Sequence, residues 1–146
     1  MPVVGEAASQ HADDLLELIR EHAAYERTTA GITREELLRL LTERHVPVRL
    51  FVAQSDRLQG YAALTFDHSL WRARRFAHLD CLFVRASGRG KGMGARLFAH
   101  VVDEARASGA DRLEWQTPDW NRDAIRFYER EGGVWHAKAR FSLALS

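Results

Sequence analysis

The chain has 146 residues, of which 46% are hydrophobic and 28% charged, and its formal net charge is +1 at pH 7. This length suits one domain with a substantial core, so residues 1–146 are expected to form a single domain. The small net charge predicts neither a nucleic-acid-binding surface nor a polybasic membrane patch, and no stretch has membrane-spanning length. The lone cysteine excludes an intrachain disulfide, and no signal peptide is visible, so a cytoplasmic protein is expected.

Alternating elements are predicted in the first half of the chain, without repeats or low-complexity linkers. Ser9 is expected to cap a helix that continues to about Tyr25, and Thr33 and Glu36 have the spacing of a capping box for a second helix. The apolar stripe expected on the first of these helices comprises Leu15, Leu18, Ile19, His22 and Ala23. Strands are expected at residues 2–7, 48–53 and 60–66.

The second half contains a strand, a glycine-rich turn and a helix in succession. The segment 93–107 has apolar residues at helical spacing, and Gly109 lies just past its end. The remaining expected elements are strands at 75–84 and 112–116, a helix at 121–130, and two short strands around 134–135 and 141–145. Hairpins followed by a β-α-β crossover indicate a mixed α/β fold.

The run Arg89-Gly90-Lys91-Gly92-Met93-Gly94 between the strand and the helix indicates an anion-binding turn. Glycines allow unusual dihedral angles and close approach of a ligand to backbone N–H groups. The helix that follows adds unpaired N–H groups and the positive end of its dipole, which favour a phosphate or pyrophosphate.

Two common phosphate-binding motifs fit this turn poorly. In a P-loop, Lys91 would precede a magnesium-binding Ser or Thr, but a glycine follows it here. A dinucleotide fingerprint would use Gly90, Gly92 and Ala95, with Glu114 as the ribose-binding acid. That fingerprint usually begins a doubly wound domain, whereas this turn lies late in the chain. A purely structural glycine turn is the remaining alternative.

The pattern Arg-x-x-Gly-x-Gly between a strand and a helix resembles the acetyl-CoA-binding motif of the GNAT superfamily of N-acetyltransferases. Residues 119–133 resemble the second signature of that family, in which Asn121 opens a helix that carries Phe127 and Tyr128 and ends at glycine. The resemblance covers essentially the whole chain. It implies a GNAT fold with a central mixed sheet of six to seven strands flanked by about four helices.

The resemblance also implies acetyl-CoA as co-substrate and assigns the residues that bind it. Backbone groups of the strand end would pair with the pantetheine arm and polarise the thioester carbonyl, and Arg89 and Lys91 would add positive charge near the phosphates. The residues expected to bind acetyl-CoA are Leu82, Phe83, Val84, Arg89, Gly90, Lys91, Gly92, Met93, Gly94, Ala95, Asn121, Ala124 and Tyr128.

Asp80 is the candidate general base, because it is a charged residue in the middle of an otherwise apolar strand. The resemblance places it where the family has an acid that often works through water. His78 lies two residues earlier, on the same face of a regular strand, and is an alternative base or a partner that orients Asp80. The structural alternative is that both residues simply pair with a neighbouring strand.

Tyr128 is the candidate general acid. In the family, the tyrosine of the Phe-Tyr pair directs its hydroxyl at the sulphur of CoA, and a thiolate leaving group needs a proton. Phe127 is expected in the core. Asn121 is expected to cap the helix through its side-chain oxygen and, by resemblance, to hydrogen-bond the pantetheine arm.

The acceptor site is expected to be acidic and aromatic, which suits a cationic amine. The residues expected to line it are Tyr25, Glu26, Trp71, Asp80 and Trp120, a set that resembles diamine and thialysine acetyltransferases. Glu26 and Trp71 could equally be an exposed charge and a packing aromatic. Those relatives usually have a second acid directly after the strand acid, whereas Cys81 stands there in this chain. Cys81 itself is expected to be a small buried residue.

The function expected from the sequence is direct transfer of an acetyl group from acetyl-CoA to a primary amine, of a polyamine, thialysine-like or aminoglycoside-like molecule. The alternative is a non-catalytic acyl-CoA sensor or interaction module. No metal is expected, because the seven histidines are scattered and lack metal-ligand spacing. No nucleic-acid or membrane partner is expected. A homodimer is suggested by resemblance, and exchange of the final strand between subunits is one route to it.

Overall fold

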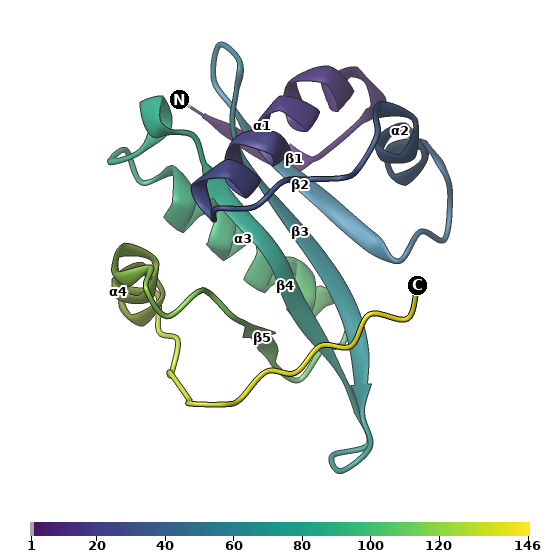
Figure 1. Cartoon of the computed structure of the whole chain (residues 1–146), viewed down its shortest axis with the longest axis vertical. Coiled ribbons are helices and arrows are strands. Elements are labelled where there is room, and N and C mark those ends of the chain that lie inside the picture. Colours follow the sequence, from purple (N-terminus) through teal and green to yellow (C-terminus); the bar gives the residue numbers. More distant parts are fainter. Residues whose placement is uncertain (1) are drawn as a thin grey trace. The chain divides into compact units, whose positions relative to one another are not determined.

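The computed structural model describes residues 2–146, which fall into two compact units, residues 2–116 and 117–146. A mixed sheet organises the first unit (Figure 1). Its strands are β1 (Val3–Glu6), β2 (Val48–Gln54), β3 (Leu58–Ser69), β4 (Arg74–Val84) and β5 (Leu113–Trp115). They lie in sequence order across the sheet, and each neighbouring pair is antiparallel except β4 and β5, which are parallel. The predicted mixed α/β class is confirmed.

Local sequence signals account for where the helices begin. The first unit contains α1 (Ala12–Tyr25), α2 (Arg34–Thr42) and α3 (Met93–Ala107), and the second contains α4 (Arg122–Arg130). The predicted capping box of α2 is confirmed, because the Glu36 N–H donates to Thr33 Oγ1 at 3.1 Å and the Thr33 N–H donates to Glu36 Oε1 at 2.9 Å.

The prediction that Ser9 caps the first helix is wrong. A 3-10 turn, η1 (Ser9–His11), precedes α1, and neither N-cap has a side-chain hydrogen bond. Instead the Ala8 N–H donates to His11 Nδ1 at 2.9 Å. Ser9 lies inside this turn, so its hydroxyl is not at the N-cap of α1.

Alternate residues of the strands pack against helices on opposite faces of the sheet. Leu50 and Val52 of β2 belong to the core cluster that also contains Leu15 and Leu18 of α1 and Leu37 of α2. Phe51, which lies between them in sequence, instead packs edge-on against His100 of α3, with ring centroids 5.0 Å apart. Helices α1 and α2 thus cover one face of the sheet and α3 covers the other.

The sheet has five strands rather than the six to seven predicted. The short strands expected around 134–135 and 141–145 are absent from the described part of the chain. A strand forms only where a neighbour accepts and donates its backbone hydrogen bonds, and these segments have none of the ladder pairings that join β1 to β5. The alternating side chains of 141–145 fit a strand, but alternation alone supplies no partner.

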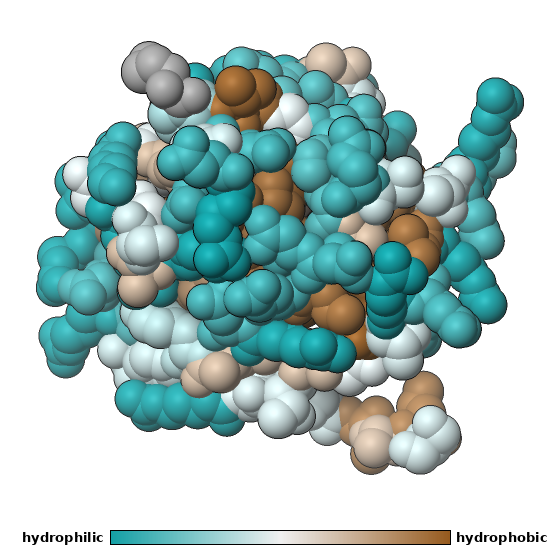
Figure 2. Space-filling model, turned by 90° about the horizontal axis from the view of Figure 1, so that it is seen from above, coloured by the Kyte–Doolittle hydropathy of each residue, from teal (hydrophilic) through white to brown (hydrophobic). Residues whose placement is uncertain are grey.

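Hydrophilic side chains predominate on the face drawn in Figure 2, and hydrophobic side chains appear there in separate small groups. Within residues 2–146, none of the helices combines the length and the apolar composition that crossing a bilayer requires.

Candidate active site

The pairing of β4 with β3 shifts by one residue at Asp80. Leu79 lies opposite Leu64 of β3 and Cys81 lies opposite the adjacent Ala63, so Asp80 is an extra residue without a partner on β3. Such a bulge bends the strand and re-aims its side chains, and bulges are over-represented next to active sites. The strand is therefore not regular where the sequence suggested it would be. The Asp80 carboxylate is exposed, and His78 lies opposite Thr65, its Nδ1 3.5 Å from the hydroxyl.

The bulge coincides with the end of the pairing between β4 and β5. Strand β5 pairs with β4 only at residues 77–79, so within the described chain no strand lies beside that edge of β4 from Asp80 to Val84. The predicted cofactor-binding residues Leu82, Phe83 and Val84 lie along this open edge. An extended ligand with amide groups can pair with such an edge as an added strand would. The Phe83 side chain belongs to the core cluster, which leaves its backbone for this role.

The glycine-rich turn brings the start of α3 to the end of β4. Gly90 and Gly92 have φ angles of 77° and 76°, in the left-handed region that favours glycine. Gly92 is the N-cap of α3, and this helix start has no side-chain cap hydrogen bond and no acidic residue in its first turn. The first N–H groups of α3 and the positive end of its dipole are therefore available to an anion.

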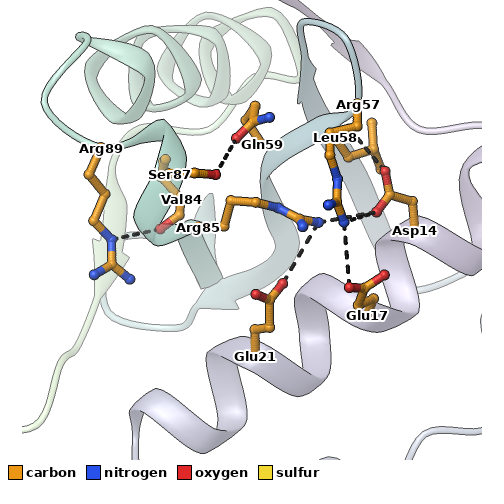
Figure 3. Close-up of polar contacts among 10 residues, drawn as sticks. All are labelled: Asp14, Glu17, Glu21, Arg57, Leu58, Gln59, Val84, Arg85, Ser87 and Arg89. Carbon is orange, nitrogen blue, oxygen red and sulfur yellow. Dashed lines mark hydrogen bonds and ion pairs between the residues drawn. The ribbon is translucent and has the colours of Figure 1, made fainter.

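A buried arginine fixes the point from which this turn departs. Arg85 follows β4, and its Nη2 lies 3.1 Å from Asp14 Oδ1 and 3.7 Å from Glu21 Oε2, both on α1 (Figure 3). The Arg85 N–H donates to the carbonyl of Gln59 on β3 at 2.7 Å. The turn is therefore tied at its origin to both a strand and a helix.

The two cations of the turn are engaged with nearby backbone and aromatic groups. Arg89 donates from Nε to the Val84 carbonyl at 2.8 Å, and its guanidinium carbon lies 5.0 Å from the ring centroid of Tyr25 and 5.3 Å from that of Phe83. Lys91 donates from Nζ to the Ser87 carbonyl at 3.3 Å. Arg89 thus links the turn to the end of α1, and phosphate binding by both cations stays a prediction.

The end of α1 meets the bulge of β4 in a cluster of polar side chains. His22 Nε2 lies 2.8 Å from Glu26 Oε2, and His22 Nδ1 lies 2.6 Å from the Tyr61 hydroxyl. The Cys81 thiol lies 3.6 Å from Asp80 Oδ2. The structure thus brings the predicted residues Glu26 and Asp80 to one region, and Tyr25 lies at its border, 6.1 Å from Phe83 between ring centroids.

Burial decides the charge state of the groups between the two carboxylates. It lowers the pKa of His22 and outweighs the opposing effects of Glu26 and Asp80, so the imidazole is neutral at pH 7. Burial also raises the pKa of the Cys81 thiol to about 12, and the negative charge of Asp80 adds to this shift. The pKa of Tyr61 is raised for the same principal reason. The cluster therefore presents two carboxylates and no compensating histidine charge.

The remaining predicted site residues are Trp71 in the first unit and Trp120, Asn121, Ala124 and Tyr128 in the second. Trp71 is 98% exposed in the turn between β3 and β4, and roughly 20 Å of strand separates the start of β4 from Asp80. In the second unit, Asn121 caps α4 by accepting the Ala124 N–H at 3.3 Å, which confirms the predicted cap. Tyr128 lies on the same helix and packs edge-on against Phe127, and Trp120 precedes the cap.

Sequence reasoning missed three residues of the first unit. His22 was expected only as part of the core-facing stripe of its helix, and neither Tyr61 nor Arg85 was given a role in the site. His22 and Glu26 lie four positions apart, a spacing at which two helical side chains meet, and this signal could have identified the pair. Tyr61 and Arg85 carry no local signal, because their partners are distant in sequence.

No three His, Cys, Asp or Glu side chains of residues 2–146 come together as a group that could hold a metal ion. The polar atoms of the cluster are hydroxyl, thiol, imidazole and carboxylate groups that hydrogen-bond one another. The arrangement can bind a cation between carboxylates, bind an anion at the start of α3, and pair an extended amide chain along β4.

Comparisons with known proteins agree with this geometry. Residues 12–133 match the model of the acetyltransferase (GNAT) family. The chain is 29% identical over 122 residues to a thialysine N-epsilon-acetyltransferase of Caenorhabditis elegans, an alignment that covers 82% of this chain and 74% of the relative. It is 30% identical over 118 residues to an aminoalkylphosphonate N-acetyltransferase of Salmonella typhimurium, covering 81% of this chain and 73% of the relative.

Among solved structures, the chain has the fold of an aminoglycoside acetyltransferase from an uncultured soil metagenomic sample, determined in complex with trehalose. The TM-score is 0.83 at 17% identity, with 99% of this chain and 97% of that chain covered. This likeness concerns the fold alone.

Proposed function

The chain belongs to the GNAT family of acetyltransferases and is an acyl-CoA-dependent N-acetyltransferase that acts on amines, and we propose that its acceptor is a small cationic primary amine. The observation that carries this proposal is the convergence of Glu26 and Asp80 around a neutral His22. Two carboxylates in one region attract a protonated amine and repel an anionic group. A thialysine-like or polyamine acceptor fits this charge better than an aminoalkylphosphonate.

Acetyl-CoA is the acyl donor in this proposal. Its pyrophosphate would bind at the N–H groups that open α3, where Gly92 leaves the helix start uncovered. Its pantetheine amides would pair with the open edge of β4 at residues 82–84. By resemblance to the family, we also propose acetyl-CoA contacts from Asn121, the N-cap of α4, and from Ala124 and Tyr128 on that helix.

Direct transfer requires four events, and the chain supplies a group for three of them. Asp80 removes a proton from the acceptor ammonium, directly or through water, so that the free amine attacks the thioester carbonyl. A backbone N–H of β4 stabilises the oxyanion. Tyr128 gives a proton to the departing thiolate, and the free amine and carbonyl are held together by binding alone.

The first test is acetyl-CoA-dependent thiol release across a panel of polyamines, thialysine, lysine, aminoglycosides, aminoalkylphosphonates and short peptides. We expect the highest kcat/KM with a small amine that carries a second positive charge. Preference for a phosphonate or a peptide would overturn the proposed substrate class. Tight acetyl-CoA binding by calorimetry without turnover of any amine would instead favour the sensor module.

Variants separate binding from chemistry. Asp80→Ala and Tyr128→Phe should each lower kcat by about 10²-fold or more and leave the Kd of acetyl-CoA close to that of the wild type. Gly92→Ala should weaken acetyl-CoA binding, because a Cβ at this φ costs roughly 1–2 kcal/mol. Gly31→Ala is the matched control, since a Cβ added there meets no atom within 4 Å and the φ of Gly31 lies outside the left-handed region.

A further inference from the structure

His22 occupies the centre of the polar cluster and is held on three sides. Its ring stacks on Phe83 with centroids 4.9 Å apart and planes inclined by 17°. Its two nitrogens contact the Tyr61 hydroxyl and the Glu26 carboxylate at 2.6 Å and 2.8 Å. The His22 side chain is 12% exposed and that of Glu26 is 35% exposed. The contacts therefore lead from a buried hydroxyl to a carboxylate at the surface of the site.

The direction of each hydrogen bond follows from the chemistry of the groups. An ionised carboxylate only accepts, so the proton of a neutral His22 must lie on Nε2, which donates to Glu26. The remaining nitrogen, Nδ1, is then an acceptor, and the Tyr61 hydroxyl must donate to it. Tyr61 thus selects the tautomer of His22 that can hold Glu26.

We propose that His22 is a positioning residue, locked by Tyr61 as the Nε2–H tautomer, which holds the Glu26 carboxylate in place to receive the acceptor amine opposite Asp80. The inference rests on the proposed function, because the acceptor is the proposed cationic amine. Glu26 is the C-cap of α1, where the helix ends and a side chain is least constrained by its own backbone. A donor fixed by stacking and by a buried hydroxyl reduces the conformational entropy that Glu26 would lose on binding a substrate.

The charges around His22 explain why a neutral donor suits this position. The groups that face it are Glu26 from α1, Tyr61 from β3, and Asp80 and Cys81 from β4. Arg89 of the glycine turn lies over the Phe83 ring on which His22 stacks. A lysine or a protonated histidine at this point would neutralise Glu26 and compete with the substrate ammonium. A neutral imidazole orients the carboxylate and leaves its charge for the substrate.

The tautomer of His22, and its dependence on Tyr61, can be measured without an assay of enzyme activity. In protein with 15N-labelled histidine, the ring nitrogen shifts of His22 should show the Nε2–H tautomer at neutral pH. Tyr61→Phe should raise the pKa of His22, because the neutral ring loses its hydroxyl donor. Glu26→Gln should instead lower this pKa below that of the wild type, because the carboxylate no longer favours the protonated ring. An Nδ1–H tautomer in the wild type, or a titration unchanged by Tyr61→Phe, would overturn the lock.

If His22 positions Glu26, its loss should change KM for the amine but not KM for acetyl-CoA. His22→Leu should raise KM for the cationic amine about tenfold and leave KM for acetyl-CoA unchanged, since one hydrogen bond to a charged group is lost. His22→Gln, whose amide can still donate to Glu26, should recover most of that loss. The control is His100→Leu, which removes a histidine with the same spacing to Glu104 on α3.

The outcomes separate this inference from the proposed function. If the wild type acetylates a cationic amine and His22→Leu changes neither KM, or raises both equally, His22 is a packing residue and the inference fails. If the tautomer of His22 and its response to Tyr61→Phe are as expected but no amine is acetylated, the proposed function fails. The control of the His22 tautomer by Tyr61 would still hold.

Discussion

At the scale of single residues, the Cys81 thiol lies between Tyr61 and Asp80. Because burial raises its pKa to about 12, almost no thiolate exists near neutral pH, and the thiol is a poor nucleophile. We expect iodoacetamide at about pH 8 to modify Cys81 far more slowly in the native protein than in urea, where its pKa returns to about 8.5. Mass spectrometry of timed samples measures both rates. Equally fast modification of the native protein would contradict this picture.

His22 also makes folding stability depend on pH. Burial lowers the pKa of His22 in the folded state below the ordinary value of 6.5, so the unfolded chain binds the proton more tightly. This contribution to the free energy of unfolding is fully present above pH 6.5 and is lost as the pH falls through the folded pKa. Urea unfolding at several pH values between about 5 and about 7 measures it. His22→Gln should flatten that part of the profile, and an unchanged slope would contradict the assignment.

At the scale of elements, the link between α1 and the end of β4 depends on one buried guanidinium. The Arg85 side chain is 6% exposed and contacts Asp14 and Glu21, whereas Arg57 contacts the same Asp14 with a side chain that is 50% exposed. Arg85→Leu should lower the free energy of unfolding by about 2 kcal/mol, because hydrogen bonds to charged groups are lost in a buried place.

Arg57→Leu is the matched control for this prediction. It should cost under about 1 kcal/mol, because water screens an exposed ion pair. Urea denaturation measures both variants. Equal losses would show that burial of Arg85 adds nothing to its ion pairs. A gain in stability with Arg85→Leu is the other contrary outcome, and it would mean that desolvation, including that of the buried and unpartnered Nε, outweighs the ion pairs.

The helices illustrate which elements follow from local sequence. The predicted segment 93–107 coincides with α3, because apolar spacing and flanking glycines define both ends. The capping box of α2 and the Asn121 cap of α4 were likewise predictable, since each joins residues three apart. The prediction for Ser9 is wrong because a 3-10 turn that begins at Ser9 precedes α1, so the N-cap of α1 is His11.

At the scale of the whole molecule, the homodimer stays a prediction. Phe141, Leu143 and Leu145 are 92%, 83% and 91% exposed, and their alternation suits one face of a strand paired with another chain. We expect sedimentation to give twice the chain mass of 16.6 kDa. Replacing all three residues by serine should give a monomer, because the apolar face is removed. Leu70→Ser, at an equally exposed leucine, should remain dimeric, and a monomeric wild type would contradict the prediction.

The sequence by itself determined the features that depend on neighbouring residues. The glycine turn, the helix that follows it and the two family signatures lie in short segments, and they identified the fold class and an acyl-CoA-dependent N-acetyltransferase. Dihedral preferences, caps and helical spacing act over a few residues, so they leave a trace in the local pattern.

Only the tertiary structure decided what lies beside each catalytic candidate. The bulge at Asp80 arises from how β3 and β4 pair, and the sequence of β4 alone does not predict it. Tyr61 meets His22 across 39 residues, and Arg85 meets Asp14 across 71. Such contacts form only when the sheet register and the position of α1 bring distant segments together, and burial, which sets the charge of His22, exists only in the folded chain.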